Sequence, residues 1–191
     1  MPVLAGPTKR FAVDDSKVSK ITADPVGGST TYASSVDIPG IKSVSIAIDI
    51  TVKELRGDNK LLDSDAVYAK ATGTFNYAKN SHDLHVVLLG ATKTDAGTTP
   101  NQTSTLALLG THRPNKFKYE GKTPTGGADP SGLVTGDEHL VLYKCMITGF
   151  GGFGFSEEDY ETFSVPFTAY ARLSDDKWID DVLNETAVAI S

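Results

Sequence analysis

Residues 43–52 read SVSIAIDITV, and their strict alternation decides the fold. Successive side chains of a β-strand point to opposite sides of the sheet. One side of this stretch is apolar, with Val44, Ile46, Ile48, Ile50 and Val52. The other side is mostly polar, with Ser45, Ala47, Asp49 and Thr51. The pattern predicts a long, half-buried strand.

Three further stretches have strand character. Residues 67–77 and 163–173 alternate in the same way, while 140–150 is apolar on both faces in its early part and predicts a more buried strand. Pro166 interrupts the 163–173 ladder, because proline has no backbone N–H to donate, so we expect an edge or a bulge there.

One helix stands out at NSHDLHVVLLGA, residues 80–91. Asn80 or Ser81 can cap its start, Asp83 lies in the first turn, and Gly90 stops it. Residues 92–102 and 121–132 are rich in turn-forming types and predict long polar loops. The sequence therefore predicts a mainly β protein, a β-sandwich or half-barrel with one flanking helix and long loops, in a single domain over 1–191.

The composition limits the classes of function. Hydrophobic residues make up 39% of the 191 residues and charged residues 22%, which suits a packed core. The net charge of −6 argues against a surface built to grip phosphates. Cys145 is the only cysteine, and neither a secretion signal nor a membrane-spanning segment is evident, so we expect a protein made in a reducing cytosol.

The glycine-rich stretch GFGGFGF, 149–155, has the glycine spacing of a dinucleotide fingerprint. That fingerprint needs a helix directly after it, whereas here another predicted strand follows. We favour a turn with aromatic anchors at a subunit contact.

No set of residues predicts catalysis or metal binding. His82 and His85 lie three apart on the helix, but two histidines are too few for zinc, and a surface pair is the favoured interpretation. Asp58, Asp63 and Asp65 lack the ligand spacing of a calcium loop. We therefore expect no enzyme activity, no cofactor and no metal.

The stretch VKELRGDNKLLDSD, 52–65, contains Arg-Gly-Asp, but the cytosolic expectation argues against receptor adhesion. Leu61 and Leu62 are more informative, because two exposed leucines on a polar loop call for something to cover them.

Residues 43–66, SVSIAIDITVKELRGDNKLLDSDA, resemble the major tail proteins, or tail tube proteins, of long-tailed, non-contractile bacteriophages. The pattern that carries the resemblance is a strand, a charged ELRGDN turn, LLD, and a second strand. KATGTFNYAKNSHDLHVVLLG, 70–90, continues the similarity as strand then helix, and the likeness extends from about 10 to about 175. GFGGFGF and the loop at 121–132 depart from it.

The resemblance implies a virion structural protein whose subunits form rings of six, with their sheets joined into one β-barrel around a lumen. The rings stack into the tail tube, through which DNA passes in transit to the host. The implied partners are copies of itself and other tail proteins, such as tape-measure, terminator and baseplate components, and no membrane. The implied location is the virion tail, assembled in the host bacterial cytoplasm.

The resemblance also implies roles for particular residues. The loop at 53–65 would be an arm laid against the adjacent ring, with contacts from Glu54, Leu55, Arg56, Asp58, Leu61, Leu62 and Asp63. The polar strand faces would line the lumen, with Asp49, Thr51, Thr72 and Thr74. Independently of the resemblance, we expect the C-terminal segment DDKWIDDVLNETAVAIS, 175–191, to dock on a neighbour with Trp178 and Ile179 as its apolar anchor. The alternative is a β-sandwich module that binds a receptor or glycan through the glycine-rich aromatic stretch.

Overall fold

The computed structural model describes residues 9–10, 13–58, 60–126, 136–154, 161–184 and 188–190. It is mainly β, with one short helix. The strands are β1 (Lys9–Arg10), β2 (Asp15–Ala23), β3 (Thr31–Tyr32), β4 (Val36–Asp37), β5 (Ile41–Gly57), β6 (Lys60–Tyr77), β7 (Thr92–Ala96), β8 (Thr103–Ala107), β9 (Lys116–Gly126), β10 (Asp137–Ile147), β11 (Phe163–Ala169) and β12 (Ile179–Asn184). The helix is α1 (His82–Leu89).

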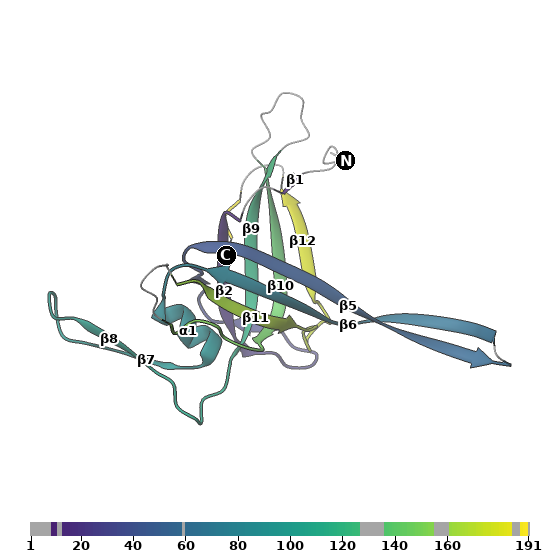
Figure 1. The fold of residues 1–191 in the computed structure, drawn as a ribbon, viewed down its shortest axis with the longest axis horizontal. Helices are drawn as coiled ribbons and strands as arrows, with labels where there is room; N and C mark the ends of the chain where they lie inside the picture. The colour runs from purple at the N-terminus through teal and green to yellow at the C-terminus, as the bar shows by residue number, and fades with distance from the viewer. Residues whose placement is uncertain are drawn as a thin grey trace.

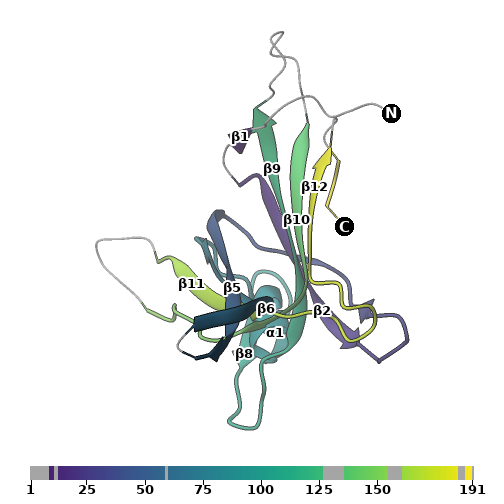
Figure 2. The same ribbon diagram turned by 90° about the vertical axis from the view of Figure 1, so that its right-hand side faces the viewer.

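The main sheet branches along β10. Its order is β3-β2-β9-β10-β11-β6-β5, all antiparallel, and β12 also pairs with β10. The first half of β10 pairs with β12, and the second half pairs with β11 beyond a register shift at 142–145. As a result β5, β6 and β11 cross obliquely over β9, β10 and β12, so that two layers face each other (Figures 1 and 2).

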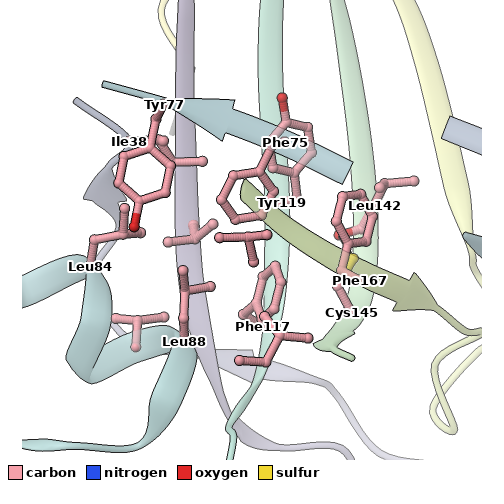
Figure 3. Packing of buried hydrophobic residues seen from close by; sticks show 14 of the residues in the cluster. Ile38, Phe75, Tyr77, Leu84, Leu88, Phe117, Tyr119, Leu142, Cys145 and Phe167 are labelled. Carbon is pink, nitrogen blue, oxygen red and sulfur yellow. Dashed lines mark hydrogen bonds between the residues drawn. The ribbon is translucent and has the colours of Figure 1, made fainter. Parts of the chain in front are cut away.

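The core fills the space between these layers and α1 (Figure 3). Phe75 of β6 stacks on Tyr119 of β9, with ring centroids 6.2 Å apart. Leu84 and Leu88 of α1 are fully buried at one end of this space. The apolar sides of the alternating strands therefore meet as the sequence predicts, and the fold is a half-open sandwich with a flanking helix.

Gly73 of β6 has no room for a side chain between its neighbouring strands β5 and β11. A Cβ there would lie 2.5 Å from the ring of Phe167 and 2.6 Å from the carbonyl oxygen of Ser45. Because real Cβ contacts are not this short, glycine lets β5, β6 and β11 approach closely.

The predicted helix is confirmed at both ends. The Ser81 side chain accepts a hydrogen bond from the Leu84 N–H, so Ser81 rather than Asn80 is the N-cap. Gly90 has a left-handed φ of 68° and donates its N–H to the Val86 carbonyl.

Three sequence predictions need correction. Residues 92–102 are not all loop, because 92–96 form β7, which pairs with β8 as a hairpin. The predicted loop at 121–132 begins inside β9, and its residues 127–132 lie outside the described residues. The strand predicted at 163–173 ends at Ala169, because Arg172 and Asp175 pair in a turn that leads back to β12.

Pro166 lies where β10 has already ended. Its carbonyl accepts from Thr148 N–H, one residue past β10. In a strand the N–H and the C=O of one residue point to the same side, so the N–H that proline lacks would also face the segment after β10. Pro166 therefore removes no hydrogen bond from the pairing with β10 itself. The expectation of an edge or a bulge at Pro166 is wrong, because β11 lies between β10 and β6 and keeps a regular register with β6 through Pro166.

Candidate assembly surface

β5 and β6 extend together far beyond the body of the protein as a two-stranded ribbon (Figure 1). Their pairing continues to Gly57 opposite Lys60, and Asp58 at the tip has a φ of 49°. Every described side chain from 50 to 70 is exposed. The predicted arm is thus a β-hairpin rather than a loop: the 53–65 loop prediction is wrong in conformation, while the projection itself is present. We call residues 50–69 the arm.

The predicted contact residues all lie on this arm and none is buried. The leucines are 61% (Leu55), 55% (Leu61) and 64% (Leu62) exposed. The Arg56 guanidinium and the Glu54 carboxylate of the same strand form an ion pair at 2.8 Å. Neither charge therefore requires a partner from a neighbouring copy. Asp58 and Asp63 form no ion pair within the described part of the chain. They remain available to a second molecule.

One face of the arm continues the apolar face of the core. Ile48, Ile50 and Val52 follow Val44 and Ile46 in the same row, but they are 49%, 57% and 58% exposed. The strand pairing shifts by one residue after Asp49 and Lys70, so that Ile50 lies opposite Tyr68. This bulge brings Tyr68 onto the same face. The alternation predicts a half-buried strand along this whole row, and the structure shows that the outer half of the row lies outside the core.

The opposite face of the inner sheet carries small polar groups. Ser45 pairs with Thr74 and Ala47 with Thr72, and β11 continues the row with Pro166 and Thr168. These residues line a shallow groove. Asp49 lies at the margin of this face, but Thr51 is already on the arm. Thr72, Thr74 and Asp49 therefore share one surface, and their position in a lumen stays a prediction.

A cleft opens between the two layers beneath β5. Val44 and Ile46 form one wall, and Tyr119 and Leu140 form the other. Lys122, at its rim, already lies 3.3 Å from Asp14. The cleft is therefore a place where the edge of the apolar core is open to solvent.

Trp178 and Ile179 lie against their own subunit. Both are partly buried on the core, and Trp178 meets Tyr68 edge-on with centroids 6.0 Å apart. Ile179 begins β12, which pairs with β10. These residues anchor the base of the arm and the sheet edge, and docking of this segment on a neighbour stays a prediction.

The prediction of a surface histidine pair is wrong for His85. Its side chain is completely buried, and Nε2 lies 2.8 Å from the Tyr77 hydroxyl. His82 instead bonds Ser104 of β8. Burial, and to a lesser extent the nearby His82, lowers the pKa of His85 to about 4. The helix face toward the sheet therefore includes this histidine, with Tyr77 as the partner of Nε2, while the buried Nδ1 has no hydrogen-bond partner among the described residues.

The glycine-rich turn packs on this buried histidine. The rings of Phe150 and Phe153 lie 5.1 and 5.7 Å from the His85 ring, and Gly151 forms a bridge to Ser164. The aromatic anchors thus contact their own subunit, although Phe153 is 64% exposed. Residues 155–160, including the last phenylalanine of the motif, lie outside the described residues.

A second projection lies at the other end of the molecule. The β7–β8 hairpin and the connection from β8 to β9 extend on the α1 side, away from the arm (Figure 1). Leu108 and Leu109 in this connection are 56% and 58% exposed. Sequence reasoning missed this pair, although its signal, two adjacent leucines in a polar segment, is the one that singled out Leu61 and Leu62.

No family model matches the chain, and no curated protein is significantly similar to it. Across the described residues, no group of three or more His, Cys, Asp or Glu side chains could hold a metal ion. No helix in the described ranges has the length and apolarity needed to cross a membrane.

Proposed function

We propose that this chain is a virion structural protein that assembles with copies of itself into stacked rings, forming the tail tube of a long-tailed, non-contractile bacteriophage. The observation that carries the proposal is the arm, a β-ribbon with an exposed apolar row. A two-stranded ribbon is at best marginally stable in water, and large exposed apolar patches mark interaction sites. A neighbouring copy that covers the arm accounts for both features.

The free edge of the sheet supports ring formation. β5 is the last strand of the sheet, and within the described residues nothing pairs with its outer side. A long unpaired edge is a template for another strand. Joining such edges between six subunits would close the sheets into one barrel and remove the edges.

The polar face suits a channel for DNA. Ser45, Thr72 and Thr74 offer uncharged hydroxyl groups. Lys70 at the margin of this face lies opposite Asp49, and the chain carries a net charge of −6. Phosphates are held mainly by Lys and Arg, so a wall of this kind would let DNA slide. In this role the chain has no catalytic site, and its partners are tape-measure, terminator and baseplate components and DNA in transit. It would be made in the host cytoplasm and reside in the virion tail.

The alternative, a receptor- or glycan-binding module, has less support. Its proposed contact, the glycine-rich aromatic turn, directs Phe150 onto His85 of the same chain. A binding platform would leave such rings free to stack on a ligand.

Electron microscopy and light scattering of concentrated pure protein, with phage initiator components supplied, test the proposal. We expect stacked rings or tubes, and protein that stays monomeric under these conditions would contradict it. The matched control removes the arm. Asp49 and Lys70 are register partners, so an Asn-Gly turn in place of 50–69 closes the hairpin at that pair. This variant should fold and form no tubes.

A further inference from the structure

Two pairs of adjacent leucines lie at opposite ends of the molecule. Leu61 and Leu62 are on the arm, and Leu108 and Leu109 are on the connection between β8 and β9. The arm points one way along the longest axis, and this connection lies on the α1 side (Figure 1). In Figure 2 the arm points toward the viewer, while the connection lies below the body. Each pair is thus accessible to a different neighbour.

Hydrogen bonds hold the connection at 108–115 in a defined conformation. The Leu109 carbonyl accepts from His112 N–H at 2.9 Å, and the Leu109 N–H donates to His112 Nδ1 at 3.3 Å. The Asn115 side chain donates to the carbonyls of Val86 and Val87 at 3.1 and 3.0 Å. The leucine pair is therefore held in a turn that is fixed to the C-terminal end of α1.

A positive charge near one leucine pair can meet a negative charge near the other. Arg113 and Lys116 are exposed and form no ion pair with any described residue. On the arm, Lys60 directly precedes the leucines and Asp63 directly follows them, while Asp58 lies at the tip; Asp58 and Asp63 are also without an ion pair there. Complementary charges around an apolar contact favour the correct partner and fix its register.

We propose that Leu61 and Leu62 of one copy pack on Leu108 and Leu109 of the next copy, with Asp63 near Arg113. This inference rests on the proposed assembly and names the surface that receives the arm. The contact is head-to-tail, so each copy uses one end to bind and offers the other end. Contacts of this type do not saturate in a pair, and they build open-ended stacks when the rotation between copies does not close into a ring.

Cross-linking of two single-cysteine variants tests this contact. Leu62→Cys and Leu109→Cys are at exposed positions, so both should fold as the parent does. The native Cys145 is fully buried, and burial raises the pKa of its thiol, so it should not react. With a short bis-maleimide, a mixture of the two variants should give a cross-linked dimer. Neither variant alone should do so.

A charge exchange is the second measurement. Asp63→Lys in the Leu62→Cys copy should lower the yield of mixed dimer about tenfold, since a like-charge pair replaces an attractive one. Arg113→Glu in the Leu109→Cys copy should restore it.

The outcomes separate this inference from the proposed function. Tubes from the parent protein without a mixed cross-link would overturn the leucine contact and leave the proposed function standing. A dimer from either variant alone would also overturn it, because the contact would then be symmetric. A mixed dimer from protein that never forms rings or tubes would support the contact and count against the tail tube.

Discussion

The inner and outer halves of the β5–β6 hairpin have the same alternation and opposite surroundings. In the inner half, Ala71 and Phe75 are completely buried, and Val44 and Ile46 pack against the core. In the outer half, Ile50 and Val52 occupy the same row and are more than half exposed. Alternation therefore shows which side chains share a face, but it does not show what covers that face.

The β7–β8 hairpin is a second projection from the body, and it differs from the arm in composition. Its strands, TKTDA and TSTLA, are short, half of their residues bear a hydroxyl, and the Lys93 side chain forms an ion pair with Asp83 of α1 at 2.9 Å. The arm has longer strands and a row of Ile, Val and Leu instead. This difference agrees with the proposal that a second copy covers the arm.

The largest expected loss of stability comes from a substitution in the inner half of the β5–β6 hairpin. Phe75→Ala should lower the free energy of unfolding by about 3–5 kcal/mol, because it leaves a cavity between Tyr119 and Phe167. The matched change in the outer half, Tyr68→Ala, should cost about 1 kcal/mol, for the edge contact with Trp178. Urea unfolding of both variants measures the difference. Equal losses would mean that the arm belongs to the folded core.

The next prediction distinguishes a loss of assembly from a loss of folding stability. Leu61→Asp/Leu62→Asp should leave the free energy of unfolding within about 0.5 kcal/mol of the parent, since both side chains are exposed. It should abolish tubes, because each leucine loses roughly 1.5–3 kcal/mol of burial and each carboxylate becomes costly in a contact. Val26→Asp, at an 83% exposed position outside the arm, is the control and should assemble normally. Normal tubes from the double variant would remove the arm from the assembly.

The sequence predicts the fold better than it predicts the surface. Strand and helix periodicity and the Ser81 and Gly90 caps are local signals, and the structure agrees with them. Burial of His85 depends on Tyr77, eight residues away, and on rings from β11 and the glycine-rich turn, so helix spacing alone suggested a surface pair. The arm contacts were suggested by the leucines, but the exposed Ile50 and Val52 were not, because their row looks the same inside and outside the body.

A third prediction concerns how the stability of the buried, inner part of the molecule depends on pH. The unfolded chain binds a proton on His85 near the ordinary pKa of 6.5, whereas the folded chain does so only near 4. The stability from keeping His85 neutral is therefore complete above pH 6.5 and is lost as pH falls toward 4. The loss should be on the order of 3 kcal/mol. Asp24 and Asp137 have pKa values lowered from 3.8, so their stabilisation is lost below this window.

Urea unfolding between pH 7 and pH 4 measures this loss. His85→Gln should flatten the pH dependence in that interval, whatever its effect at pH 7. His112→Gln, in the connection between β8 and β9, should leave the slope unchanged. An unchanged slope in His85→Gln would show that other groups carry the acid sensitivity.

The smallest expected effect belongs to the Arg-Gly-Asp tip. The Arg56 and Glu54 side chains are 70% and 44% exposed, so their 2.8 Å ion pair is well screened by water. Arg56→Ala should change the free energy of unfolding by less than about 0.5 kcal/mol. It should also weaken assembly less than Leu61→Asp/Leu62→Asp does, because the ion pair is satisfied within one strand and is not needed by a neighbour. Lys53→Ala, in the same ribbon, serves as the control for loss of one positive charge. Loss of tubes in Arg56→Ala but not in Lys53→Ala would show that Arg56 contacts the neighbour directly and that its pairing with Glu54 is broken on assembly.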